Sequence, residues 1–161
     1  MHCFVPTFSC TVCLICFSFK SSSQALANAL PTADKPYEGS INYYEWLRCQ
    51  FASKRAILEE GLRSIGVKPM PSHGGFFVMA QLPELDVSDM DHLDEPYDWK
   101  LCRKIAKDYN IIGIPASSFF TPGYEKQYGP LARFAMCKKD ETLIEARRRM
   151  MEGAERIANE K

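Results

Sequence analysis

The segment Gly129–Met150, GPLARFAMCKKDETLIEARRRM, contains a strand and a helix around which the rest of the predicted fold is arranged. Its residues 131–136 are mostly apolar and predict a short strand. Side chains alternate between the two faces of a strand. One face would therefore carry Leu131, Arg133 and Ala135, and the other Ala132, Phe134 and Met136.

A C-terminal helix follows this strand, and we expect it to span residues 141–158. Asp140 can cap the helix, and Glu141 lies in its first turn, where a negative charge is favourable. An apolar stripe at helical spacing predicts its buried face, namely Leu143, Ala146, Met150, Ala154 and Ile157. The three arginines at 147–149 favour a solvated helix face over an anion site.

Arg133 is the unusual residue of the strand, because a guanidinium stays charged and needs an anionic partner there. One alternative is an internal ion pair with a nearby Asp or Glu. The other is a ligand carboxylate, held by two parallel N–H groups of the guanidinium. The segment alone favours the internal pair, since ion pairs and arginines whose head groups extend to solvent are common.

Length and composition predict a soluble protein with one globular core. The chain has 161 residues, of which 46% are hydrophobic and 25% charged. Its 20 basic residues balance 20 acidic ones, so nothing indicates a nucleic-acid surface or a basic membrane patch. Of the 7 cysteines, Cys49, Cys102 and Cys137 lie in the globular part, within apolar patterns. This usage is typical of a reducing compartment and favours the cytoplasm.

Residues 1–23 form an apolar, cysteine-rich segment that we separate from a domain at residues 24–161. A signal peptide over residues 1–27 is one interpretation, although no Lys or Arg precedes the apolar run. That run is shorter than the roughly 20 residues of a transmembrane helix. The cysteines at 10, 13 and 16 lack the fourth ligand of an iron–sulfur motif, and we predict no metal site. The remaining interpretation is a non-native or alternative start.

Two helices are expected at the beginning of the domain. Residues 24–30 predict a short helix that ends at Pro31, and residues 41–65 predict a long helix. Ser40 or Asn42 can cap the long helix. Its apolar stripe is Tyr44, Leu47, Phe51, Leu58, Leu62 and Ile65.

Two extended segments follow the long helix. Residues 67–70 predict a short one, and residues 76–82 predict a buried strand. The turn between them contains His73, Gly74 and Gly75. A single turn histidine is usually only exposed, and we favour that interpretation for His73.

The second half of the domain begins with an acidic loop at residues 83–96. It lacks the central Gly and terminal Glu of a calcium loop, so we expect a solvated, mobile loop. A helix then starts at Pro96, with the apolar stripe Tyr97, Leu101, Ile105 and Tyr109. Residues 111–114 predict a strand, and residues 116–120 a turn.

The order of these elements predicts an α+β layer. Neighbouring strands without crossover helices indicate a small sheet, mostly antiparallel or mixed, with helices packed on one face. The sequence contains neither an internal repeat nor a glycine-rich nucleotide-binding loop.

Three segments in order resemble a known family. They read NYYEWLRCQFASKRAILEEGLRSIGVKPMPSHGGFFVMAQLP, then DEPYDWKLCRKIAKDYNIIGIPASSFF, then ARFAMCKKDETLIEARRRM. Together they look like the C-terminal segment of fold-type I, pyridoxal-phosphate-dependent class I/II aminotransferases. The most similar subgroup is kynurenine aminotransferase/glutamine transaminase K, with related methionine-type enzymes. The likeness runs from about Gln24 to Ile157.

The resemblance implies roles for particular residues. Arg133 stands at the position of the family's arginine that binds the substrate α-carboxylate, which reverses the preference for an internal ion pair. Gly74 and Gly75 match a segment that approaches the site, as do Ser117 and Phe119. A planar guanidinium suits a planar carboxylate and would orient the α-amino group toward the cofactor.

The resemblance also implies what these residues lack. The family's Schiff-base lysine and the residues that bind pyridoxal 5'-phosphate lie upstream of this segment. Lys20 follows Ser18 and Phe19 much as in the lysine motif, but it lies too near Gln24 to fill that role. We therefore expect no catalytic residue, no cofactor binding by this chain alone and no activity alone, with Arg133 as the inherited substrate-binding residue.

The functional prediction is a C-terminal fragment of an aminotransferase that transfers amino groups between amino acids and 2-oxo acids. A homodimer is expected from the family, with no nucleic acid or membrane as partner. The alternative is a non-catalytic interaction module that pairs with full-length aminotransferases. The compartment predicted from the thiols is the cytoplasm, and the resemblance adds mitochondria as an alternative.

Overall fold

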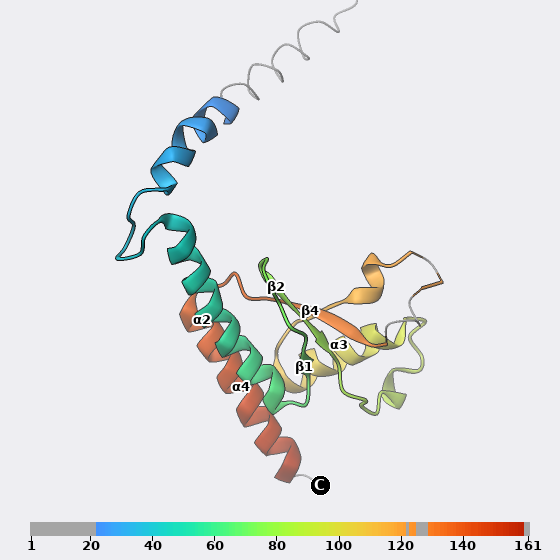
Figure 1. The fold of residues 1–161 in the computed structure, drawn as a ribbon. Coiled ribbons are helices and arrows are strands. Elements are labelled where there is room, and N and C mark those ends of the chain that lie inside the picture. Colours follow the sequence, from blue (N-terminus) through green and yellow to red (C-terminus); the bar gives the residue numbers. More distant parts are fainter. Residues whose placement is uncertain (1–21, 122, 125–128, 160–161) are drawn as a thin grey trace, which may run out of the picture. The chain divides into compact units, whose positions relative to one another are not determined.

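A computed structural model describes residues 22–121, 123–124 and 129–159 (Figure 1). The chain divides into two compact units, Met1–Cys49 and Gln50–Lys161. In the first unit, residues 22–33 are helical, so the prediction that the helix ends at Pro31 is wrong. The φ of proline is compatible with a helix, and its missing N–H removes a single backbone bond. The predictions for Lys20 and the N-terminal cysteines lie outside the described residues.

Helix α2 spans Tyr43–Ser64 and confirms the predicted long helix. Asn42 is its cap, because the Asn42 Oδ1 atom accepts a hydrogen bond of 2.8 Å from the backbone N–H of Glu45. The helix ends before Gly66, whose φ of +78° suits a residue without a β-carbon. Leu58, Gly61 and Leu62 are its buried residues.

The sheet has four strands, and each neighbouring pair is antiparallel. Its order is β1-β2-β4-β3, which confirms the α+β prediction. The strands are β1 (Lys68–Pro69), β2 (Phe77–Gln81), β3 (Ile114–Pro115) and β4 (Leu131–Ala135).

The strand predicted at residues 111–114 is mostly wrong, because only Ile114 of that run pairs with β4. The chain leaves the preceding helix through the left-handed Asn110, which has a φ of +55°. Ile112 is 82% exposed, so its side chain contributes little to the core. A run of isoleucines therefore indicated more strand than the backbone forms.

Helices α3 (Tyr97–Tyr109) and α4 (Asp140–Asn159) complete the layer. One face of β2 and β4 is buried against α2, α3 and α4, and it consists of Val78, Ala80, Ala132 and Phe134. The strands β2 and β4 and the adjoining β3 expose the opposite face. We call this side the open face, defined by Phe77, Met79, Gln81, Ile114, Leu131, Arg133 and Ala135.

The acidic loop at residues 83–96 exposes most of its carboxylates, as predicted, and its mobility stays a prediction. It contains the short 3-10 helix η1 (Ser88–Met90), and Met90 is buried. Its carboxylates pair with cations of α3, in the ion pairs Asp89–Lys107 at 3.6 Å, Asp91–Lys100 at 3.2 Å and Glu95–Arg103 at 2.7 Å. The loop therefore lies against α3, with Asp89 and Asp91 still exposed to solvent as its composition predicts.

Helix α4 lies beside α2, and the two are drawn side by side in Figure 1. Arg147 joins them through an ion pair of 2.7 Å with Glu60. Asp140 is the first residue of α4, and its carboxylate lies 3.0 Å from the Lys54 ammonium. None of the helices in the described part of the chain is long and apolar enough to span a membrane.

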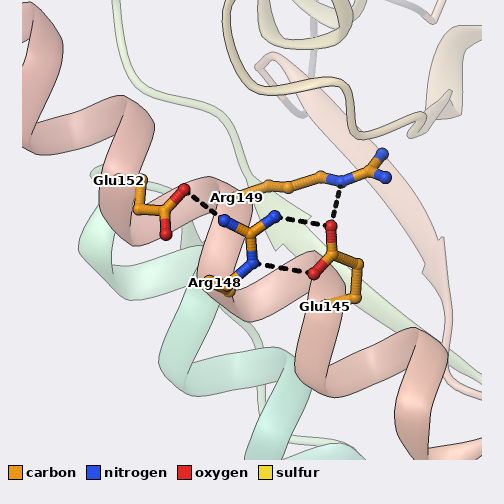
Figure 2. A network of polar contacts seen from close by, with 4 residues as sticks. All are labelled: Glu145, Arg148, Arg149 and Glu152. Atoms are coloured by element: carbon orange, nitrogen blue, oxygen red, sulfur yellow. Dashed lines mark hydrogen bonds and ion pairs between the residues drawn. The ribbon is translucent and has the colours of Figure 1, made fainter.

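Arg148 and Arg149 of the arginine run lie on the solvated face that the sequence predicts, whereas Arg147 pairs with α2. Figure 2 shows Arg148 between Glu145 and Glu152, with Arg149 donating to Glu145 as well. The two guanidinium groups, Arg148 first, lower the pKa of Glu145 to about 2. These cations are therefore neutralised by carboxylates of their own helix.

Candidate carboxylate-binding site

Arg133 lies at the centre of β4, between two neighbouring strands. Its cross-strand partners are Met79 of β2 and Ile114 of β3. Because β4 is an interior strand, backbone hydrogen bonds on both sides fix the position of its Cα atom. The alternation of the strand then directs the side chain to the open face, as the sequence predicts.

Two aromatic rings hold the guanidinium group of Arg133. Its Cζ atom lies 4.3 Å from the centroid of the Phe77 ring and 4.5 Å from that of the Phe119 ring. Phe77 belongs to β2, and Phe119 ends the 3-10 helix η2, which spans Ala116–Phe119. Cation–π contacts of this kind stabilise a guanidinium and restrict its orientation without using its N–H groups.

The described residues provide no anionic partner for Arg133. No ion pair among them involves its guanidinium, and its Nε atom is buried without a hydrogen-bond partner. A buried charged donor that lacks an acceptor is costly. The internal ion pair that the strand pattern favours is therefore not formed within the described part of the chain.

Ser117 lies in the same short helix as Phe119 but contacts a different residue. Its backbone N–H donates to Asp98 Oδ2 at 3.0 Å, and its hydroxyl donates to Asp98 Oδ1 at 2.9 Å. Asp98 is only 7% exposed and also accepts a bond of 3.1 Å from the backbone N–H of Trp99. Burial, with a further contribution from the Asp98 charge, raises the pKa of the neighbouring Cys102 to about 12.

Gly74 and Gly75 lie in the exposed turn that leads into β2. Gly75 has a φ of +83°, which favours glycine, and Ser72 donates a hydrogen bond of 3.1 Å to the Gly74 carbonyl. His73 in the same turn is exposed. A site-lining role for the two glycines stays a prediction.

The sequence pattern predicts neither the contact of Phe77 with Arg133 nor that of Asp98 with Ser117. Phe77 was placed in a buried strand, whereas the register shows that it shares the open face with Arg133. Asp98 was left off the stripe of α3, where Tyr97 was named and proves 44% exposed. A signal existed for Asp98, since it precedes Leu101 by three residues and Cys102 by four, on one helical face.

That these residues form no pyridoxal phosphate site by themselves stays a prediction. Such a site needs a lysine for the imine and a charged partner for the pyridine nitrogen. The contacts described for Arg133 include neither group. Several lysines pair with carboxylates elsewhere, as in Lys54–Asp140 and Lys104–Asp108. Within the described ranges there is also no cluster of His, Cys, Asp or Glu that could hold a metal ion.

Comparison with solved structures shows that the chain has the fold of the aminotransferases. N-Succinyldiaminopimelate aminotransferase from Mycobacterium tuberculosis is 28% identical with a TM-score of 0.57, over 81% of this chain and 29% of its own. An aminotransferase from Saccharomyces cerevisiae superposes with a TM-score of 0.61 at 21% identity, over 82% of this chain and 30% of its own.

Sequence comparison then gives the family. The family model for aminotransferase class I and II matches residues 13–149, and the chain belongs to this family. Kynurenine--oxoglutarate transaminase 3 of Mus musculus is 35% identical over 121 residues, which are 74% of this chain and 26% of the mouse protein. The chain thus spans about a quarter of the length of this relative, which confirms the predicted resemblance to a segment of the family.

Proposed function

We propose that these residues are the small-domain part of a pyridoxal-phosphate-dependent aminotransferase and that Arg133 binds the α-carboxylate of its substrate. The observation that carries the proposal is the state of Arg133, which is fixed by two rings and has no described anionic partner. A carboxylate could accept two parallel N–H bonds from the guanidinium. That contact would orient the α-amino group of an amino acid for reaction.

The substrate class is proposed from the relative. The mouse protein is named a kynurenine--oxoglutarate transaminase, so we propose an amino acid such as kynurenine and a 2-oxo acid such as 2-oxoglutarate. Bound in the whole enzyme, pyridoxal phosphate would supply the electron sink for amino-group transfer. The part of Arg133 is to hold the carboxylate end of either substrate, in a protein that we expect to act as a homodimer.

The proposal also states that these 161 residues do not catalyse the transfer by themselves. The test is to mix the purified chain with pyridoxal phosphate, reduce it with borohydride and map any cofactor adduct by mass spectrometry. We expect no stoichiometric adduct and no transaminase turnover. A stoichiometric adduct on Lys20, together with turnover, would overturn this part of the proposal.

Ligand binding tests the role of Arg133 directly. Saturation-transfer NMR with 2-oxoglutarate should show binding by the wild-type chain, with a dissociation constant on the order of 1 mM or weaker because one end of the ligand is held. Arg133→Met should abolish the signal. Arg156→Met is the matched control, because Arg156 is an exposed residue of α4 and donates a hydrogen bond to the carbonyl of Asp108, away from Arg133. Equal loss in both variants would contradict a specific role for Arg133.

A second candidate function is a non-catalytic module that pairs with full-length aminotransferases. The open face supports it, since Phe77 is 37% exposed and Ile114 is 41% exposed on a sheet face that carries an unpaired guanidinium nitrogen. Co-elution with an intact kynurenine--oxoglutarate transaminase in size-exclusion chromatography would support this candidate. The absence of any complex at micromolar concentrations would remove it.

A further inference from the structure

We infer that Asp98 is a positioning residue for Arg133, which it affects through Ser117 and Phe119. Asp98 does not touch the guanidinium in the described contacts. Its carboxylate fixes the short helix η2, and η2 places the Phe119 ring against Arg133. The inference rests on the proposed function only in that the positioned guanidinium is the one that would bind a carboxylate.

The link between Asp98 and η2 uses both carboxylate oxygens. One accepts the backbone N–H of Ser117 at 3.0 Å, and the other accepts its hydroxyl at 2.9 Å. Hydrogen bonds to an ionised acceptor are about twice as strong as those between neutral groups. Both bonds are partly buried, and the Asp98 end is only 7% exposed, so competition from water is reduced. The start of η2 is therefore tied to helix α3 at a single residue.

Phe119 belongs to the same short helix as Ser117, so fixing Ser117 also limits the position of Phe119. The helix spans four residues, Ala116–Phe119, and the backbone N–H of Phe120 closes it by donating to the Ser117 carbonyl at 3.1 Å. Strand β3 directly precedes η2, and its Ile114 pairs with Arg133 itself. Phe119 therefore lies only two residues beyond the bonded Ser117 in a short helix whose start is fixed on both counts, which limits how far its ring can move from the guanidinium.

Orientation of the guanidinium is the property that this arrangement controls. Two parallel hydrogen bonds to a carboxylate require the plane of the guanidinium to lie within about 10–20° of the orientation that faces the carboxylate. Phe77 is fixed by strand pairing, but Phe119 lies outside the sheet and is 59% exposed. The Asp98–Ser117 contact is the feature that fixes the second ring, so its loss should free one side of Arg133.

A purely structural alternative is that Asp98 only stabilises α3. It is an acidic residue in the first turn of that helix and accepts the Trp99 backbone N–H. Under this alternative, Asp98 variants would lower stability but would leave the environment of Arg133 unchanged in the folded protein. A measurement at Arg133 in the folded chain therefore separates the two interpretations.

The experiment records the Nε–Hε resonance of Arg133 in the full chain, assigned by its disappearance in Arg133→Lys. A proton near ring faces is shielded, so the resonance should lie upfield of those of the exposed arginines. Asp98→Asn and Ser117→Ala should each move it toward the exposed-arginine position. The matched controls are Asp94→Asn and Ser118→Ala, because both residues are exposed neighbours of the same chemical types.

If the resonance keeps its wild-type position in folded Asp98→Asn and Ser117→Ala, the inference is overturned. If Asp98→Asn does not fold, Ser117→Ala decides, since it removes only the hydroxyl bond and keeps the backbone N–H bond. Movement in the controls equal to that in the test variants would also overturn it. The readout needs no ligand, so failure of 2-oxoglutarate to bind would count against the proposed function and not against this inference.

Discussion

The Cε methyl group of Met150 fills the space that a side chain at Gly61 would need. A β-carbon on Gly61 would lie 2.3 Å from Met150 Cε and 3.0 Å from the Cα atom of Arg147. Both distances are shorter than van der Waals contact, and the second is to backbone. The absence of a side chain at Gly61 thus allows α2 and α4 to approach closely on the buried side of the layer.

We predict that Gly61→Ala destabilises the chain, although alanine is the better helix former by about 1 kcal/mol. Overpacking against Met150 and the α4 backbone should cost about 1–3 kcal/mol and exceed that gain. Urea unfolding followed by circular dichroism measures the change. In a double-mutant cycle, Met150→Ala should relieve part of the cost. A Gly61→Ala chain as stable as wild type would show that the helices are not packed this closely.

The Glu145 network predicts a dependence of stability on pH. The folded-state pKa of Glu145 is lowered from 4.5 to about 2, so its stabilising contribution is present above 4.5 and is lost as the pH falls toward about 2. The difference in urea midpoint between wild type and Glu145→Gln should therefore shrink as the pH falls from 5 to 3. Glu155→Gln, on the same helix and exposed, is the control. Parallel pH curves for wild type and Glu145→Gln would contradict the network.

Cysteine labelling tests the burial of α3. Cys102 is 6% exposed and its pKa is raised to about 12, whereas Cys137 is exposed. At pH 8 the thiolate fraction of Cys102 is about one in ten thousand. Iodoacetamide should label Cys137 in the folded chain and Cys102 only after unfolding, as read by peptide mass spectrometry. Comparable labelling of the two thiols in native buffer would contradict the packing of α3.

The open face predicts self-association of the isolated chain. Ile114 on this face and Ile144 on α4 are similarly exposed, at 41% and 47%. Ile114→Ser should lower the concentration-dependent association seen in sedimentation velocity, while Ile144→Ser should change it little, because exposed apolar sheet faces favour contacts between molecules. A larger decrease in association for Ile144→Ser than for Ile114→Ser would contradict this prediction and place the associating surface on α4.

Much of the fold could be predicted because local patterns and tertiary packing agree. The alternation around Arg133 gave the two faces of β4, and the stripe with Leu143 and Met150 gave the buried side of α4. The errors occurred where local signals competed. Ile111 and Ile112 have strand propensity but follow a helix that ends in a left-handed residue, and Pro31 lies inside a helix that it was expected to end.

The site could be predicted only in part, because its geometry depends on distant residues. The sequence marked Arg133 as a charge in an apolar strand, but its contact with Phe77 depends on strand register. Asp98 and Ser117 are nineteen positions apart, and no periodic pattern connects a helix to a turn over that separation. The close approach of Gly61 to Met150 is likewise a property of packing between helices.

Binding of a carboxylate to Arg133 on the open face can be followed through the Nε–Hε resonance of Arg133 during a titration with 2-oxoglutarate. We predict a saturable downfield shift of the Arg133 resonance, no shift for Arg156, and no shift of either with the dimethyl ester of 2-oxoglutarate. An Arg133 resonance that stays in place up to saturating 2-oxoglutarate, or that moves equally with the ester, would contradict the account.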